Sequence, residues 1–161
     1  MRLLLLALAL LAFTPMSPAL AEPATANHPE ARPFDQSANA TEQVDAALAR
    51  ARISGKRVIV VMGANWCHDS RGLAGWFAQP GFAAMLEPKY EIVYVDVGQK
   101  DHNIDIARRF GIKSIKGTPT VLVLSPRGKL LNRRSAPKWR DAASREDEDI
   151  FAYFDQFSAE R

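Results

Sequence analysis

Three short apolar runs, at residues 58–62, 92–97 and 120–124, constrain the fold of this chain more than any other feature. The first run is continuous and rich in β-branched residues, which is typical of a strand buried on both faces, and the other two are interpreted as further strands. Segments with apolar residues at helical spacing separate the runs. The order of helix, strand, helix, strand, helix, strand, strand, helix predicts an α/β fold, in which a central mixed β-sheet is flanked by helices on both faces.

The predicted helices begin and end at recognisable residues. Apolar side chains recur at helical spacing from Thr41 onward. A second helix is expected after residue 67, and Pro80 opens a further helical piece, because proline is favoured in the first turn. A short helix over residues 104–110 is closed by Gly111.

The C-terminal part begins with a predicted hairpin. Proline and glycine occupy the second and fourth positions of residues 125–128, which fits a type I turn, so residues 129–131 are expected to return as an antiparallel strand. Residues 132–143 are polar and basic and are interpreted as a loop. Ser144 followed by Asp147 resembles a capping box at the start of the last helix.

The N-terminus has the pattern of a secretory signal peptide over residues 1–21. Arg2 supplies a short positive region, an apolar run follows, and cleavage is expected after Ala21. The apolar run is shorter than the roughly 20 residues that a membrane helix needs, so no stable membrane anchor is expected. A cleaved signal peptide predicts a periplasmic or secreted protein, in a compartment that is oxidising.

Residues 22–40 contain three prolines and lack apolar periodicity, and we interpret them as a flexible leader in which His28 is inert. The folded domain is then expected over residues 41–161. The chain has 21 basic and 18 acidic side chains, a net charge of +3, and loss of Arg2 with the signal peptide lowers this to +2. So small a charge does not indicate a nucleic-acid partner.

Cys67 is the one cysteine of the chain, which excludes an internal disulfide framework and a metal site built only from cysteines. It lies directly after the first predicted strand and at the start of a predicted helix. The free N–H groups and the positive end of the helix dipole favour a thiolate there. His68 adds to this effect when protonated, whereas Asp69 opposes it. The alternative is an inert cysteine that packs as a small apolar residue.

Two stretches of the chain resemble the thioredoxin superfamily. Residues 66–70, with the sequence W-C-H-D-S, follow the first strand as the W-C-x-x-C motif does in that family. Residues 109–120 resemble the segment that leads into the family's cis-proline strand. The two motifs occur in the same order as in the family, and the resemblance extends over about residues 41–157.

The resemblance implies a thioredoxin-like fold and a role for several residues around the sulfur. Pro119 is expected to be cis, so that the Thr118 backbone pairs with an extended substrate chain. Trp66 is expected to form an apolar shelf beside Cys67, although a partly buried core aromatic is an equal alternative.

The departures from the family pattern decide which chemistry remains. Ser70 replaces the second cysteine, and an alcohol cannot form the S–S bond that resolves a mixed disulfide. Val61 replaces the buried aspartate that many thioredoxins use as a base for the second thiol. The two losses are consistent, and they exclude a thioredoxin-like dithiol cycle. Ser70 is expected either to donate a hydrogen bond to the Cys67 thiolate or to serve only as a helix-start residue.

We therefore predict thiol–disulfide exchange with Cys67 as the single nucleophile, in a C-x-x-S variant of the site. The chemistry is of the mixed-disulfide, isomerase-like or glutathione-linked kind, and the interpretation as an enzyme is favoured. The partner is a thiol- or disulfide-bearing protein or a small thiol. No cofactor and no metal are expected.

The main alternative is a non-catalytic module with a thioredoxin-like fold. Such a module would dock extended peptides beside Pro119, or form a homodimer joined through Cys67. The basic residues Arg133, Arg134, Lys138 and Arg140 could then contact an acidic partner or lipid head groups, although a solvated loop is the usual meaning of such a run.

Two further alternatives are weaker. A metal-handling module would use Cys67 and His68 together with Met62 or His102. A hydrolytic triad of residues 67–69 is excluded, because adjacent side chains at a helix start point away from one another.

Overall fold

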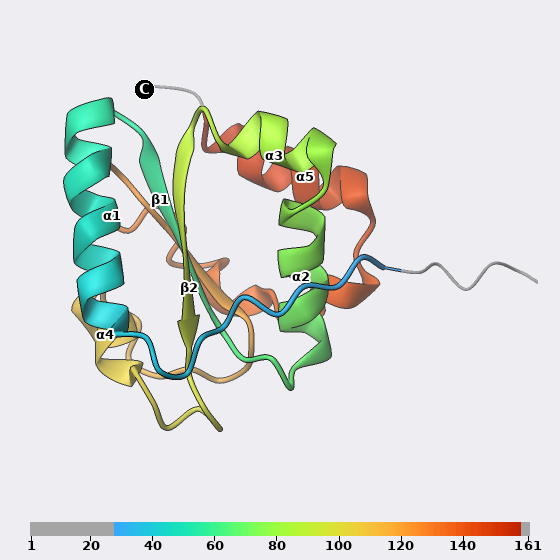
Figure 1. The fold of residues 1–161 in the computed structure, drawn as a ribbon, viewed down its shortest axis with the longest axis horizontal. Helices are drawn as coiled ribbons and strands as arrows, with labels where there is room; N and C mark the ends of the chain where they lie inside the picture. The colour runs from blue at the N-terminus through green and yellow to red at the C-terminus, as the bar shows by residue number, and fades with distance from the viewer. Residues whose placement is uncertain (1–27, 159–161) are drawn as a thin grey trace, which may run out of the picture.

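The computed structural model describes residues 28–158 (Figure 1). The predicted signal peptide, residues 1–21, lies outside the described residues. Among residues 28–158, no helix has the length and hydrophobicity that crossing a bilayer requires. The elements follow in the order α1 (Ala40–Ser54), β1 (Arg57–Gly63), α2 (His68–Phe77), α3 (Pro80–Leu86), β2 (Tyr90–Asp96), α4 (Ile104–Arg109), β3 (Thr120–Leu124), two 3₁₀ turns η1 (Ala136–Lys138) and η2 (Ala142–Ser144), and α5 (Asp147–Gln156).

The described strands form one mixed sheet in the order β2-β1-β3. β1 pairs in parallel with β2, from Arg57 opposite Tyr90 to Gly63 opposite Asp96. It pairs antiparallel with β3, with Met62 opposite Thr120. The central strand β1 is fully buried after its first residue, as its continuous apolar run predicts.

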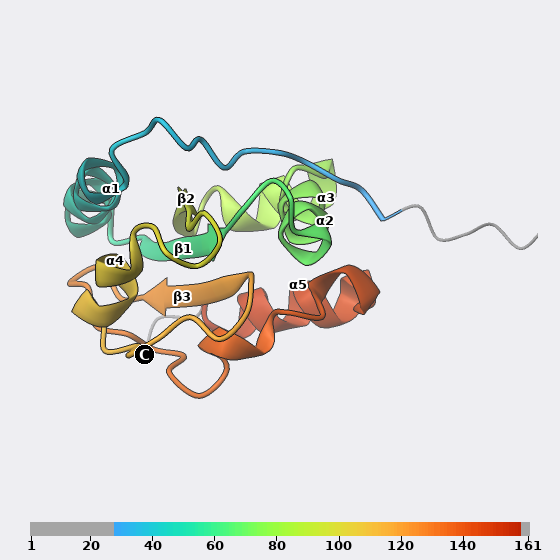
Figure 2. The same cartoon turned by 90° about the horizontal axis from the view of Figure 1, so that it is seen from below.

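Helices cover both faces of the sheet, which confirms the predicted fold class. Alternate residues of β1 point to opposite faces. Val58, Val60 and Met62 join the core under α1 and α4. Ile59 and Val61 join the core under α2, α3 and α5. Figure 2 shows the strands between these two groups of helices.

The predicted return strand at residues 129–131 is reduced to a single bridge between Leu124 and Leu130. Leu131 N still donates to Val123 O at 2.8 Å, and beyond it a side chain continues the pairing with β3. The Asn132 side chain accepts a hydrogen bond from Val123 N at 2.9 Å and donates one to Val121 O at 2.8 Å. A side-chain amide carries the same donor and acceptor as a peptide group, so it satisfies the edge of β3 without a strand.

The region after the bridge departs further from its interpretation as a loop. Residues 132–143 contain the turns η1 and η2, and Trp139 is fully buried, with its ring stacked on Phe154 at 5.0 Å. Ser144 does not cap the last helix: its hydroxyl donates to Asp141 O, and α5 begins at Asp147 after Glu146.

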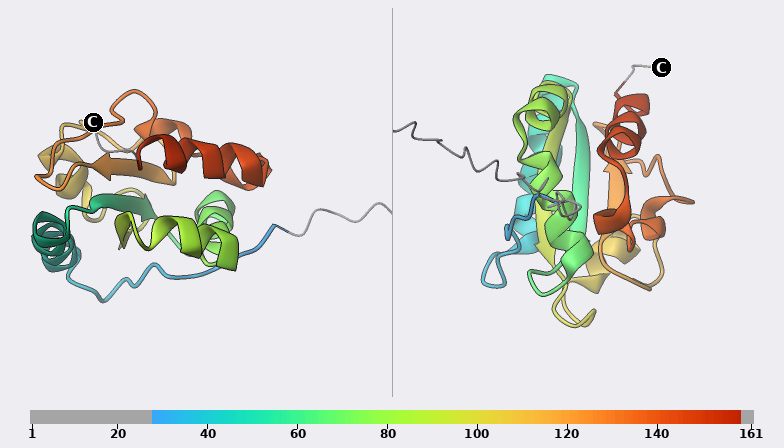
Figure 3. Two further views of the ribbon diagram at one scale, coloured as in Figure 1. Left: turned by 90° about the horizontal axis from the view of Figure 1, so that it is seen from above. Right: turned by 90° about the vertical axis from the view of Figure 1, so that its right-hand side faces the viewer.

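Residues 28–39, which the sequence places in a flexible leader, form an extended N-terminal segment that packs on the domain. It runs from α2 past β2 to the start of α1 (Figures 1 and 3). Phe34 is 2% exposed, and its backbone N–H and C=O both bond to the Asn65 side chain. An extended segment anchored by one aromatic ring has no periodicity, which explains why the sequence pattern missed it.

Candidate functional site

Cys67 forms the N-cap of α2, directly beyond the end of β1. Its carbonyl accepts the first bond of the helix from Arg71 N, at 3.0 Å. Cys67 is 8% exposed, and its Sγ donates to the Thr118 carbonyl at 3.3 Å. The two motifs of the sequence analysis therefore meet at the sulfur, although they lie 51 residues apart along the chain.

The Thr118–Pro119 bond is cis, as the resemblance implies. Thr118 and Pro119 are both buried. The loop is held by Thr120, whose hydroxyl donates to Gly117 O at 2.9 Å. Within residues 28–158, the Thr118 N–H donates to no acceptor. The backbone beside the sulfur thus keeps one donor that an extended chain can use.

Trp66 lies next to Cys67 and is 47% exposed, so its ring offers apolar surface to a bound molecule. The ring is held in place, because Nε1 donates to Gly98 O at 2.9 Å. Gly98 is in turn fixed by Asp96, whose Oδ1 accepts from Gly98 N at 2.8 Å. The indole ring is therefore held in place by hydrogen bonds and is half exposed at the surface, rather than packed in the core.

Ser70 lies in the first turn of α2 and is fully buried. Its hydroxyl makes no hydrogen bond to any residue in the described part of the chain, so the expected bond to the Cys67 sulfur is not formed. Ser70 Oγ and the Phe34 ring both lie beside Gly63, since a Cβ built on Gly63 would come within 2.6 Å of Oγ and 2.8 Å of the ring. Val61 is buried in the core on the same face of the sheet.

The side chains of residues 67–69 diverge, as adjacent positions require. His68 is exposed, with Nε2 3.4 Å from the Glu30 carboxylate. Asp69 accepts from Ala143 N at 2.9 Å, which ties α2 to η2. Neither side chain hydrogen-bonds to the sulfur, so no triad is assembled.

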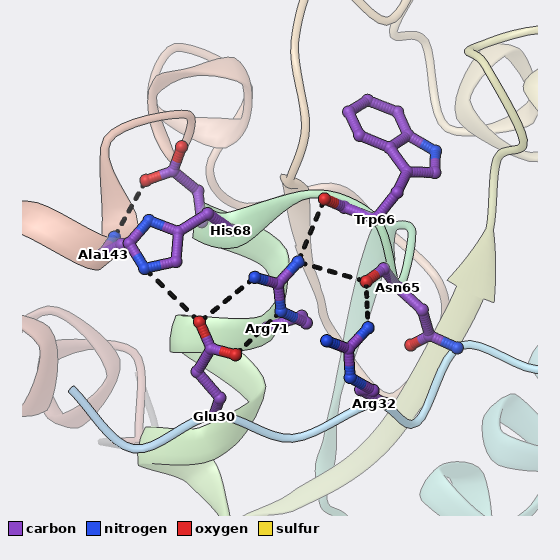
Figure 4. A network of polar contacts seen from close by, with 8 residues as sticks. Glu30, Arg32, Asn65, Trp66, His68, Arg71 and Ala143 are labelled. Atoms are coloured by element: carbon purple, nitrogen blue, oxygen red, sulfur yellow. Dashed lines mark hydrogen bonds and ion pairs between the residues drawn. The ribbon is translucent and has the colours of Figure 1, made fainter. Parts of the chain in front are cut away.

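A polar network on the other side of the Cys67 loop was missed by the sequence analysis (Figure 4). Arg71 donates from Nη1 to the carbonyls of Trp66 at 3.0 Å and Asn65 at 3.2 Å. Its other nitrogens bond to both oxygens of Glu30. The one available signal was the position of Arg71 four residues after Cys67, one helical turn away. Nothing in the sequence points to Glu30.

The residues weighed as metal ligands lie apart. Met62 is buried under α1, whereas His102 is exposed and bonds to Asp101 at 3.0 Å, which raises the pKa of the imidazole. Among residues 28–158, the one group of three acidic, histidine or cysteine side chains close enough to share an ion is at residues 146–148, on the surface at the start of α5. Cys67 does not belong to it.

The comparisons with known proteins agree with this geometry. A profile of a thioredoxin-like family matches residues 39–126. A disulphide isomerase from Xylella fastidiosa Temecula1 has a similar structure, with a TM-score of 0.75 and 29% identity over 80% of this chain and 98% of that one. A thioredoxin from Thermus thermophilus shares the fold at a TM-score of 0.50 and 22% identity, over 70% of this chain and 82% of that one. No match was found among curated proteins.

Proposed function

This chain belongs to the thioredoxin-like family, and we propose that it performs thiol–disulfide exchange with Cys67 as its single nucleophile. The observation that carries the proposal is the placement of Sγ at the N-cap of α2, 3.3 Å from Thr118 O and beside Pro119. The helix N-terminus stabilises a thiolate, and the loop before Pro119 offers a backbone to pair with. The similarity to a disulphide isomerase supports the same class of reaction.

The proposed reaction begins when the Cys67 thiolate attacks one sulfur of a substrate disulfide. A new S–S bond forms to Cys67 as the substrate bond breaks, and the second substrate sulfur leaves as a thiolate that takes a proton from water. The protein and substrate are then joined as a mixed disulfide.

Release of the mixed disulfide requires a thiol from outside this chain, because Ser70 cannot form an S–S bond. If another thiol of the substrate attacks, it forms the new substrate disulfide, Cys67 leaves as the thiolate, and the net reaction is isomerisation. If a small thiol such as glutathione attacks the Cys67 sulfur, the substrate sulfur leaves as a thiolate and Cys67 is left glutathionylated. If it attacks the substrate sulfur instead, Cys67 leaves as the thiolate and the substrate is left glutathionylated.

The proposal includes the setting of the reaction. The partner is a disulfide- or thiol-bearing protein or a small thiol, and the reaction takes place in the periplasm or outside the cell, after cleavage behind Ala21. Disulfides form and persist in such compartments, so substrates are available there. The N-terminal pattern of the sequence supports this assignment.

The direct test compares the mature chain with Cys67→Ala. We expect the wild type to form one mixed disulfide per chain with scrambled ribonuclease and to restore ribonuclease activity slowly when a small thiol is added. Cys67→Ala should form no mixed disulfide and keep the melting temperature within a few degrees, because only a sulfur atom is lost. Mixed-disulfide formation by Cys67→Ala would contradict the assignment.

A second candidate is the non-catalytic module, and the burial of Cys67 favours it. A silent thiol would be alkylated no faster than a free cysteine, which ionises near pH 8.5, and extended peptides would still bind beside Pro119. The homodimer linked through Cys67 is a further form of this candidate. It would show twice the mass of the single chain when the oxidised protein is measured under non-reducing conditions.

A further inference from the structure

The N-terminal segment, residues 28–39, packs closely against α2 and against the end of β1, the two elements that flank the Cys67 loop. A Cβ added at Gly75 would collide with Pro29 O and would lie 2.6 Å from Glu30 N. A Cβ added at Gly63 would lie 2.8 Å from the Phe34 ring. Both contacts are closer than real Cβ atoms approach, so the two glycines are what allow the segment to lie this near. The segment is therefore a fixed part of the site.

Glu30 is brought by this segment to the side of Arg71. The carboxylate accepts from Arg71 Nε at 2.9 Å and from Nη2 at 3.2 Å, which is the two-pronged geometry that suits a guanidinium. A backbone bond from Ala31 N to Arg71 O, at 3.1 Å, holds the two chain segments in register. The Arg71 side chain is only 15% exposed. Its position is thus determined by Glu30 on one side.

On its other side Arg71 holds the loop that carries the sulfur. Nη1 bonds to the carbonyls of Asn65 and Trp66, the two residues directly before Cys67. The pKa of Arg71 is raised, chiefly by its hydrogen bond to Glu30, and the charge of a Cys67 thiolate also contributes. The guanidinium is thus held against the backbone of the two residues that precede the sulfur.

We propose that Arg71 is a positioning residue for the exchange reaction, and that Glu30 of the N-terminal segment sets it in place. This inference rests on the proposed function. Arg71 fixes the direction of the Asn65 and Trp66 carbonyls, and hence the entry of the chain into α2, while its positive charge favours the thiolate. Glu30 makes no hydrogen bond to the sulfur. It contacts Arg71 through two hydrogen bonds and His68 through an ion pair at 3.4 Å, and its proposed role is exerted through Arg71.

The role of Glu30 can be separated from simple electrostatics because the two predict opposite signs. The Glu30 carboxylate repels the negative charge of a Cys67 thiolate. If charge alone matters, replacing Glu30 with a neutral residue therefore favours the thiolate and speeds the reaction. If positioning matters, the same replacement leaves the Arg71 guanidinium without its partner and slows the reaction. The other charged side chains facing the loop are Arg32, His68 and Asp69. None of them is substituted in the test, and of the three His68 loses an ion-pair partner in Glu30→Gln.

The experiment measures the reaction of Cys67 with 2,2′-dithiodipyridine, an uncharged disulfide whose leaving thione is followed by absorbance. Because Cys67 is the only cysteine, the signal reports one site. Rates at pH 7 and the pH midpoint of iodoacetamide alkylation are determined for wild type, Arg71→Gln, Arg71→Lys and Glu30→Gln. The controls are Arg50→Gln and Glu91→Gln, which break a surface Arg–Glu pair, joined by one hydrogen bond at 2.8 Å, between α1 and β2.

We expect Arg71→Gln to react about threefold or more slowly and to shift the alkylation midpoint to higher pH, in line with the loss of a neighbouring cation. Arg71→Lys should keep a midpoint near the wild-type value with an intermediate rate, since it retains the charge but not the fork. Glu30→Gln should be about twofold slower. The controls should match the wild type.

Several outcomes would overturn the inference. A Glu30→Gln rate equal to or above wild type would exclude positioning by the segment. An unchanged profile for Arg71→Gln, with a wild-type circular dichroism spectrum, would exclude Arg71. A wild-type thiol that does not react at all would overturn the proposed function and this inference with it, whereas a reactive wild type with unchanged variants overturns the inference alone.

Discussion

Ser70, whose hydroxyl is buried, is the residue that restricts this site to chemistry with a single thiol. Within the described part of the chain it has no hydrogen-bond partner, and it lies against Gly63 and the Phe34 ring. A buried polar group without a partner costs about 1–3 kcal/mol. A thiol at the same position loses less on burial, because cysteine packs as a small apolar residue. The pocket around Ser70 therefore suits a thiol better than the alcohol that occupies it.

We predict that Ser70→Cys converts the site to a dithiol. The two residues stand at the N-cap and first turn of one helix, a spacing at which the Cα atoms are within the about 4.4–6.8 Å that a disulfide requires. Under a mild oxidant the variant should lose two hydrogens by mass and resist alkylation, and it should then reduce insulin with a dithiol donor.

Ser70→Ala is the matched control, and we expect it to unfold at higher denaturant concentration than the wild type, by about 1 kcal/mol, because an unpartnered hydroxyl is removed. Failure of Ser70→Cys to close a disulfide would mean that the helix start does not present the two side chains to each other.

At the scale of the elements, the edge of β3 is completed by a side chain. Asn132 is 4% exposed and bonds to the backbone of Val121 and Val123 and to the Tyr153 hydroxyl. It takes the place of the short return strand and also ties the sheet to α5. The residues after Asn132 are therefore held against the sheet without forming a regular strand.

We predict that Asn132→Ala is strongly destabilising, by about 2–4 kcal/mol, because it leaves a buried N–H and a buried C=O without partners. Asn39→Ala is the comparison, since Asn39 is an exposed N-cap whose side chain accepts only from Glu42 N. That change should cost about 1 kcal/mol. Urea unfolding of both variants gives the measurement, and equal losses would show that the Asn132 amide does not carry the edge of the sheet.

These elements also show which parts of the fold could be predicted. The strands and the start of α2 followed from patterns that depend on local chemistry, such as continuous apolar runs and a proline or glycine at a helix end. Asn132 and Trp139 were misread because polar or basic neighbours surround them, and only tertiary packing shows that they are buried. At the site, Cys67 and Pro119 were found through motifs, whereas Glu30 acts through a contact 41 residues away that no local pattern encodes.

For the whole molecule, the N-terminal segment joins parts that the sheet alone does not connect. Phe34 inserts into the core under α2 and contacts the Tyr94 ring of β2 at 5.5 Å. Glu30 and Ala31 bind Arg71, at the start of the reactive helix. A domain beginning at residue 41 would lose these contacts. The boundary of the working unit therefore lies before residue 30, within what the sequence pattern describes as a leader.

Gly75→Ala tests whether docking of the segment and reactivity of the sulfur are linked. The new methyl group would meet the backbone of Pro29 and Glu30, which cannot move aside as a flexible side chain can, so the segment must lift. We expect faster hydrogen exchange at Ala31 N–H, which bonds to Arg71 O, and a Cys67 rate as slow as that of Glu30→Gln. Overpacking should also cost about 1–3 kcal/mol, less the gain from replacing a helical glycine.

Gly81→Ala is the control for this experiment, because a Cβ at Gly81 has nothing within 4 Å and the residue also lies in a helix. It should leave both the exchange at Ala31 and the Cys67 rate unchanged, with neutral or slightly higher stability. If Gly75→Ala lifts the segment and the Cys67 rate stays at the wild-type value, the segment contributes to stability only. If both change together and Gly81→Ala changes neither, the contact between the segment and α2 is what couples the N-terminus to the sulfur.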